Sequence, residues 1–178
     1  MTESKKVQDK ILWTYIGLPF RPAYGTYDTW EDLPTVPKTE LAKFEKIKTI
    51  RDLQDNLTYV KIAIGTSVTA CYFNFLEEDM FYRDQQDCVV WYFNESIGVY
   101  YLQGEGQMMV VSSTLAEFLA RISLENRIWK KSAKTHFHLL HGPYDKSEKI
   151  DKVKEWTALS KLLADEELEY LQVYYDKF

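Results

Sequence analysis

The stretch VVWYFNESIGVYYLQGEGQMMVVSSTLAEFLARISLENRIW, residues 89–129, decides the fold that we predict for this chain. It contains three runs of β-branched, aromatic and other apolar residues, separated by polar turns that contain glycine. Such runs are typical of consecutive β-strands. Because the turns between them are short, we expect neighbouring strands of one sheet. The predicted strands are Val89–Phe93, Val99–Leu102 and Met108–Val111.

A helix is predicted directly after the third strand. Thr114 and Glu117 have the spacing of a capping box, in which a hydroxyl and a carboxylate accept hydrogen bonds from unpaired N–H groups at a helix start. Apolar residues then recur at helical spacing, which indicates a helix from Thr114 to about Lys130. We expect Phe118 to be buried against Val90, Tyr100 or their neighbours. The predicted buried stripe is Leu115, Phe118, Leu119 and Ile122.

Further strands are predicted earlier in the chain. LTYVKIAIG, residues 57–65, alternates between two side-chain faces, which indicates a strand that ends at Gly65. VTACYFNFL, residues 68–76, is a second strand, and an acidic turn leads from it to Met80–Tyr82. Sequential, short strands joined by turns favour an antiparallel or mixed meander over a parallel array. One face of the first strand would consist of Val60, Ile62 and Ile64.

The segment TELAKFEKIKTIRDLQDN, residues 39–56, is compatible with two structures. Its apolar residues recur at spacings near three, as in one curved helix. The alternative is a strand at Phe44–Ile47 followed by a short helix from Thr49 or Ile50 to Gln54. We favour the alternative, because β-branched residues lower helix propensity and Thr49 can cap the short helix.

The two ends of the chain differ in character. Residues 1–38 hold four of the five prolines and many aromatic residues, which predicts an irregular arm anchored to the body, or alternatively a partner-binding surface. From Lys149 to about Tyr174 the composition is helical, with a break near Asp165. Its apolar stripe would contain Ile150, Val153, Trp156, Leu159, Leu162 and Leu163.

The whole chain of 178 residues is predicted to be one α+β domain, in which helices flank a sheet of about five to six strands. The irregular arm would be residues 1–38, the core residues 39–131 and the C-terminal helical extension residues 132–178. Apolar residues make up 46% of the chain, which excludes wholesale disorder. No apolar run reaches the roughly 18 residues that span a bilayer, so we expect a soluble cytoplasmic protein without membrane contact.

Acidic residues are concentrated between residues 77 and 105, where seven acids accompany a single base, Arg83. A further segment, Arg121–Lys134, is basic, and such asymmetry can steer a charged partner. The alternative is that solvated turns are simply acidic and that bases favour a helix C-terminus. The candidate partner-binding residues are Glu77, Glu78, Asp79, Asp84, Asp87, Glu95 and Glu105.

The order of these elements resembles the SUKH superfamily, which includes the yeast regulator of cell-wall glucan synthesis, bacterial immunity proteins and viral members. The resemblance covers residues 44–129, and its strongest element is STLAEFL, residues 113–119. Leu33-Pro34 matches the start of the family's early segment, but the Asn-Gly that usually follows is missing. The resemblance implies a highly bent sheet flanked by helices, used as a non-catalytic binding scaffold. In bacterial members this means neutralising a toxin, often a nuclease.

A metal-dependent enzyme is the competing hypothesis. All three histidines lie in HFHLLH, where they could supply three nitrogen ligands to zinc, with Asp145 as a base. No HExxH motif, cysteine pair or phosphate-binding loop accompanies them. The candidate ligands are His136, His138 and His141.

Nucleic-acid binding is disfavoured, because base-stacking sites pair their aromatic residues with cations and residues 71–105 contain one base. We assign most of this region's aromatic residues to the core. The prediction is therefore a non-catalytic protein-binding domain without a cofactor. Its partner would be another protein, either a basic toxin or nuclease or a host regulatory protein. The aromatic residues weighed in this way are Tyr72, Phe73, Phe75, Trp91 and Phe93.

Overall fold

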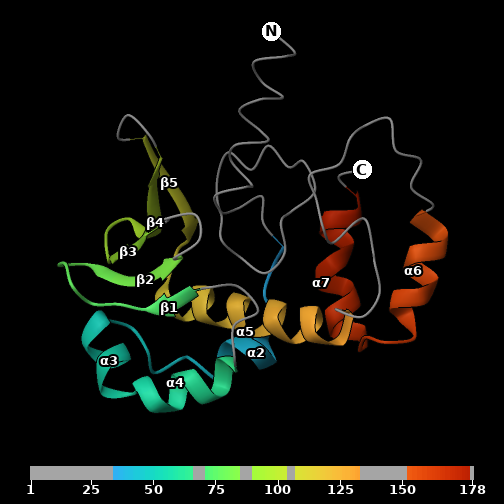
Figure 1. Cartoon of the computed structure of the whole chain (residues 1–178), viewed down its shortest axis with the longest axis horizontal. Helices are drawn as coiled ribbons and strands as arrows, with labels where there is room; N and C mark the ends of the chain where they lie inside the picture. Colours follow the sequence, from blue (N-terminus) through green and yellow to red (C-terminus); the bar gives the residue numbers. More distant parts are fainter. Residues whose placement is uncertain (1–33, 66–70, 85–89, 104–106, 133–151, 177–178) are drawn as a thin grey trace, which may run out of the picture.

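The computed structural model describes residues 34–65, 71–84, 90–103, 107–132 and 152–176. Within these ranges five strands form one antiparallel sheet in the order of the sequence (Figure 1). This confirms the predicted α+β class, the meander and the three strands between residues 89 and 111. The strands are β1 (Cys71–Phe73), β2 (Met80–Asp84), β3 (Val90–Asn94), β4 (Gly98–Gln103) and β5 (Gln107–Ser112).

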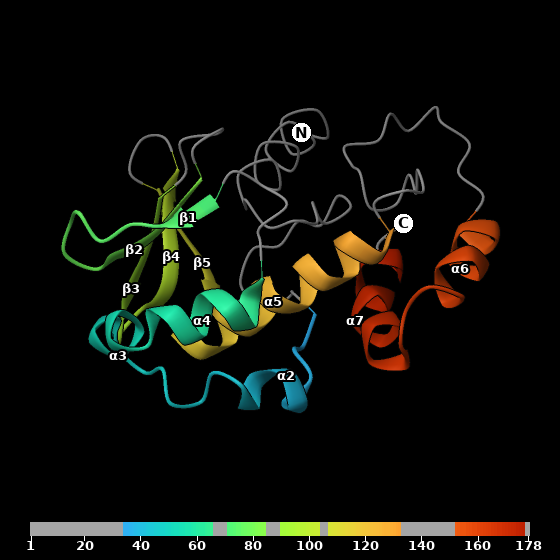
Figure 2. The same ribbon diagram turned by 60° about the horizontal axis from the view of Figure 1, so that its bottom comes forward.

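Helices cover one side of this sheet. Figures 1 and 2 show α3, α4 and α5 on the same side, with α5 continuing past the sheet towards α7. No helix in the described ranges is long and apolar enough to cross a membrane. The helices are α2 (Lys38–Ala42), α3 (Ile50–Asp55), α4 (Leu57–Ile64), α5 (Leu115–Ser132), α6 (Lys152–Ser160) and α7 (Asp165–Asp176).

Helix α5 begins where the sequence predicts. The Thr114 Oγ1 atom accepts a hydrogen bond from the backbone N–H of Glu117 at 3.1 Å, which is the hydroxyl half of the capping box. The Glu117 carboxylate accepts a bond from the Ser113 hydroxyl at 3.0 Å. The predicted stripe is confirmed, because all four of its side chains are buried: Leu115, Phe118, Leu119 and Ile122.

An aromatic cluster lies between α5 and the sheet. The Phe118 ring is fully buried, and its centroid lies 5.4 Å from that of Phe81, 6.0 Å from that of Tyr82 and 6.2 Å from that of Trp91. The rings of Phe81 and Tyr82 meet Phe118 edge-on, a geometry that aromatic quadrupoles favour. Phe118 therefore packs on Trp91, which follows Val90 in the chain, and this agrees with the predicted burial against Val90, Tyr100 or their neighbours.

Residues 57–64 form helix α4, so the strand predicted for residues 57–65 is wrong. Val60 and Ile64, four residues apart, are buried, whereas Ile62 between them is 76% exposed. That pattern is helical, and α4 packs on α5. This packing outweighs the weak preference of β-branched residues for strands. The predicted end is correct, because Gly65 terminates α4 at a φ of 80° that glycine adopts without a Cβ penalty.

A turn connects α2 to α3, so the strand predicted at Phe44–Ile47 is wrong, and so is the single curved helix. Phe44 and Ile47 are fully buried anchors of this turn. The predicted short helix is confirmed as α3. The hydroxyl of Thr49 accepts a bond from Asp52 N at 3.1 Å, and the Asp52 carboxylate accepts one from Thr49 N at 3.0 Å.

Strand β1 covers only residues 71–73 of the strand predicted at 68–76, whose first three residues lie outside the described ranges. After Phe73 the chain turns. The side-chain oxygen of Asn74 accepts a bond from the backbone N–H of Leu76 at 3.1 Å, and such a local bond competes with strand pairing.

The predicted C-terminal helical extension is present as α6 and α7, with the expected break directly before Asp165. The Glu167 carboxylate accepts a hydrogen bond from Ala164 N at 3.2 Å at the start of α7. The predicted stripe is buried only in part, since Val153 is 77% exposed and Leu162 is 43% exposed. Residues 149 and 150 lie outside the described ranges. Two leucines of these helices are fully buried, Leu159 in α6 and Leu171 in α7.

A buried carboxylate joins α2 to α5. Glu40 is 3% exposed and receives two bonds from the Arg127 guanidinium, at 2.9 and 3.3 Å. The Ser123 hydroxyl donates to the same carboxylate at 2.7 Å, and Lys43 does so at 3.2 Å. Burial opposes the charge of Glu40, but these donors outweigh burial and hold its pKa below the usual value.

A second polar cluster joins α5 to α7 and to the segment before α2. The Arg121 side chain, 1% exposed, donates to the Pro34 carbonyl at 2.8 Å and to the Tyr170 hydroxyl at 3.0 Å. The same guanidinium donates to Glu117 at 3.2 Å, and the Tyr170 hydroxyl donates to Glu125 at 2.7 Å. Among residues predicted for the arm, 34–37 are irregular, and the aromatic residues before them lie outside the described ranges.

Replacing Phe118 by alanine should lower the free energy of unfolding by about 3 to 5 kcal/mol, because a fully buried ring is lost and a cavity remains. Urea denaturation measures this change. Ile62→Ala is the control, since Ile62 is mostly exposed and its change should stay within about 0.5 kcal/mol. Equal small effects of the two changes would place Phe118 outside the core.

Glu40 should make stability depend on pH. Its folded pKa is depressed, so its contribution is full above the unfolded pKa of about 4.3 and is lost as pH falls through the folded pKa. Glu40→Gln should cost about 2 kcal/mol at neutral pH, the scale of a hydrogen bond to a charged group. The difference between the two proteins in urea denaturation should close in acid. A difference that persists unchanged at low pH would contradict this role.

Candidate functional site

The face of the sheet opposite α5 carries a set of partly exposed side chains, which we call the outer sheet face. Side chains alternate along each strand, so the burial of Trp91 and Phe93 turns Val90 and Tyr92 outward. In the described ranges no helix covers this side (Figure 1). The outer sheet face consists of Tyr72, Arg83, Val90, Tyr92, Tyr100, Leu102, Met108 and Val110.

The apolar part of this face lies over β4 and β5. Leu102 and Met108 are directly opposite each other in the two strands, and they are 51% and 43% exposed. Tyr100 is opposite Val110 in the same pair of strands. Directly opposed side chains on one face lie close enough to touch, so these residues form one exposed apolar strip.

Tyr92 and Tyr100 form a stacked pair in the middle of the outer sheet face. They oppose each other across β3 and β4, with ring centroids 5.4 Å apart and an interplanar angle of 21°. We call these two residues the tyrosine pair. The Tyr92 hydroxyl donates a long hydrogen bond of 3.4 Å to Glu77.

Acids next to the tyrosine pair shift its titration. Burial, and then the charge and hydrogen bond of Glu77, raise the pKa of Tyr92. Burial, and then the charge of Asp79, raise the pKa of Tyr100. Each effect favours the neutral phenol. Like ordinary tyrosines, the pair is uncharged at neutral pH, and it lies within electrostatic reach of two carboxylates.

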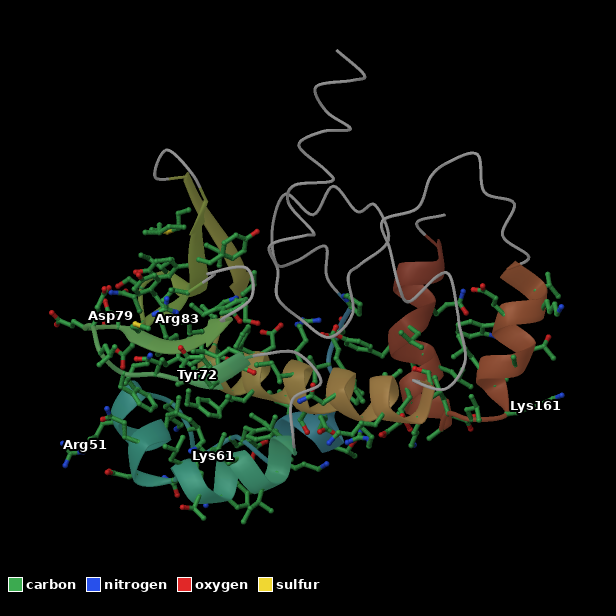
Figure 3. All side chains as sticks on the ribbon, in the orientation of Figure 1. Arg51, Lys61, Tyr72, Asp79, Arg83 and Lys161 are labelled. Carbon is green, nitrogen blue, oxygen red and sulfur yellow. The ribbon has the colours of Figure 1, made fainter. Side chains whose placement is uncertain are left out.

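Four of the predicted partner-binding acids lie at one end of the sheet, which we call the acidic end. Three of them are in the turn before β2, and Glu95 is in the turn between β3 and β4. These turns are adjacent, because the carbonyl of Asp79 accepts a hydrogen bond from Phe93 N at 2.8 Å. Figure 3 shows Asp79 on the sheet side of the molecule, away from the cations of Arg51 and Lys61 on the helices. The acidic end consists of Glu77, Glu78, Asp79 and Glu95.

Glycine is required where the second of these turns enters β4. Gly98 has a φ of 103°, and a Cβ atom there would lie 2.3 Å from the carbonyl oxygen of Ser112. Asn94 Oδ1 accepts a bond from Ser96 N at 2.8 Å and helps to close the turn. Glu95 is thus held at a fixed position beside the start of β4.

Of the other predicted acids, the structure describes only the position of Asp84, which lies away from the acidic end. Asp84 closes β2 at its opposite end, where it pairs with Cys71. Asp87 and Glu105 lie outside the described ranges. Of the five predicted acids that the structure describes, four lie at the acidic end, and the length of β2 separates Asp84 from them.

The candidate zinc ligands His136, His138 and His141 lie outside the described ranges. Across residues 34–65, 71–84, 90–103, 107–132 and 152–176, no group of three histidine, cysteine or acidic side chains could hold a metal ion.

Sequence reasoning did not identify the outer sheet face. Most of the aromatic residues that the sequence analysis assigned to the core do lie in or against the core, since Trp91 and Phe93 are buried and Phe73 and Phe75 pack against it. Tyr72 is the exception, with 39% of its surface exposed. The signal was the alternation of Tyr92 with Trp91 and Phe93, which shows that β3 has two faces but not which of them is covered.

Searches for related proteins found no matching family model, no matching curated protein and no matching solved structure.

Two substitutions should separate the titrations of the tyrosine pair. Glu77→Gln should lower the pKa of Tyr92 towards its usual value, and Asp79→Asn should lower that of Tyr100, since each removes the charge that disfavours the phenolate. Both values should stay raised, because burial is the larger cause. NMR titration of the tyrosine rings measures both pKa values in the unchanged protein and in each variant. A shift of both tyrosines by either change, or of neither, would contradict the assigned neighbours.

Proposed function

We propose that this protein is a non-catalytic protein-binding domain that captures a basic partner through the outer sheet face and the acidic end. The observation that supports this most directly is the exposed strip of Leu102 and Met108 beside the tyrosine pair. Contiguous exposed apolar surface with a polar rim is typical of sites where another molecule binds.

The composition of the surface favours a protein as the partner. Aromatic residues, methionine and arginine are enriched in the centres of protein interfaces, whereas lysine, glutamate and aspartate are depleted there. The outer sheet face contains three tyrosines, one exposed methionine and one arginine, and the acids of the acidic end lie in the turns beside it. This is the arrangement of an apolar centre with a charged rim.

Charge supports a basic partner. All four rim residues of the acidic end are carboxylates, and Arg83 is the single cation of the outer sheet face. Charges at a rim act mainly on the rate of encounter, because they attract a partner of opposite sign before contact. The resemblance to the SUKH superfamily supports the same proposal, since its bacterial members neutralise toxins that are often nucleases. The two roles we propose are toxin neutralisation and modulation of a regulatory protein.

The partner can be identified by covalent capture. A photoreactive residue at position 72, on the exposed outer sheet face, should cross-link a basic protein from extracts of the source cells. The same group at position 62, on the exposed side of α4, is the matched control. Capture from position 62 alone, or of acidic proteins from position 72, would contradict the proposal.

Neutralising the acidic end should slow association with that partner. The variant Glu77→Gln, Glu78→Gln, Asp79→Asn should lower the association rate at low salt by about tenfold, because it removes charges that attract the partner. The association rate of the variant should also depend less on salt, since fewer charges remain for salt to screen at about 0.1 M. Asparagine is chosen at residue 79 because its φ is 65°, a conformation that asparagine tolerates. Unfolding stability should hardly change, since exposed acids contribute little to it.

The control removes three exposed acids elsewhere, by Glu45→Gln, Asp55→Asn and Glu169→Gln. It matches the change in net charge and should leave most of the association rate intact. Stopped-flow or surface-based kinetics at several salt concentrations measure both variants. If the association rate changes neither with salt nor in the Glu77, Glu78 and Asp79 variant, the acidic end has no part in binding.

A further inference from the structure

We propose that the tyrosine pair, with Glu77 and Asp79, binds the guanidinium group of an arginine side chain supplied by the partner. The same partner segment places an apolar side chain, two residues further along, on the strip of Leu102 and Met108. This inference rests on the proposed function and specifies what its surface recognises.

The tyrosine pair offers a cation both a π-face and neighbouring negative charge. Its two rings are stacked 5.4 Å apart and remain partly exposed on the outer sheet face. The Glu77 carboxylate lies at the edge of the pair, where it accepts a bond from the Tyr92 hydroxyl. Asp79 is in the same turn, whose backbone is bonded to Phe93 N next to Tyr92, and its charge raises the pKa of Tyr100. A cation over an aromatic face is attracted by the ring quadrupole, and the attraction grows when the cation is partly desolvated.

A guanidinium fits this site better than an ammonium group. It is planar, so it can stack on a tyrosine ring while its edge donates hydrogen bonds to a carboxylate. It is also less strongly hydrated than an ammonium group, so leaving water costs it less. This chain already contains such an arrangement, since Arg121 lies 5.9 Å from the ring centre of Tyr170 and pairs with Glu117.

The apolar strip adds a second recognition element at a defined distance. Tyr100 and Leu102 are two residues apart in β4 and face the same side, which separates them by about 6.8 Å. An extended segment lying along β4 repeats its own side chains at that spacing. Its arginine would meet the tyrosine pair when the residue two places away meets Leu102 and Met108. The recognised pattern is therefore arginine, any residue, then leucine or a similar apolar residue.

Short peptides test this pattern on the full-length protein. The probe is acetyl-Ser-Arg-Ser-Leu-Ser-amide, compared with peptides that carry lysine or uncharged citrulline in place of arginine, or glutamate in place of leucine. Binding is followed by NMR shifts of the tyrosine rings and of the Leu102 and Met108 methyl groups. We expect the arginine peptide to shift both sets. We expect citrulline to weaken binding about tenfold, lysine to weaken it less, and glutamate to abolish the methyl shifts.

Protein variants separate stacking from other causes. Tyr100→Leu should weaken the arginine peptide about tenfold, whereas Tyr100→Phe keeps the π-face and should stay within about threefold. Tyr59→Leu is the matched control, because Tyr59 is an exposed tyrosine on α4 beside Lys46, and it should leave binding unchanged. Equal affinity for the arginine, lysine and citrulline peptides, shifts confined to other residues, or no shifts at all would overturn the arginine site.

The two proposals fail in different ways. In one case the identified partner still cross-links at position 72, and its association rate still falls when the acidic end is neutralised. If Tyr100→Leu then leaves the partner's dissociation rate unchanged, the arginine site is wrong and the binding surface stands. If the partner does not engage position 72, the binding surface itself is wrong.

Discussion

The packing of Phe118 between Phe81, Tyr82 and Trp91 is the contact on which the rest of the structure depends. It fixes α5 against the inner side of the sheet, and it is available only because Trp91 and Phe93 point inward from β3. The strand's alternation then leaves no freedom for the other face, since a shift of one residue would expose Trp91. The contact that positions α5 therefore also determines which residues of β3 lie on the outer sheet face.

This one-sided covering gives the two faces different tasks. The inner face contributes the fully buried rings that close the core, whereas the outer sheet face keeps Tyr72, Leu102 and Met108 partly exposed. The turns at the acidic end are set by backbone bonds, such as that from Phe93 N to the Asp79 carbonyl. Surface charge there is therefore separate from the contacts that maintain the fold, and it can serve recognition.

Helix α5 is held on its other sides by polar contacts rather than by apolar ones alone. Glu40 meets Arg127 and Ser123, and Arg121 meets Tyr170 and the Pro34 carbonyl. Buried charges lose hydration, so such contacts add less to stability than their number indicates. They are directional, however, and they define where α2 and α7 lie relative to α5 more narrowly than apolar packing would.

The sequence by itself determined the antiparallel meander, the start of α5 at Thr114 and the cap at Thr49, because turns, capping bonds and adjacent strands are local. It also placed Glu77, Glu78 and Asp79 in a turn before β2. Tertiary structure decided that residues 57–64 are a helix. Val60 and Ile64 can share one face of either a strand or a helix, and the packing of α4 on α5 selects the helix. It likewise decided which side of β3 faces outward, and that Asp84 lies away from Glu77 to Asp79. Those outcomes depend on which face a distant helix covers and on strand direction, which no local pattern contains.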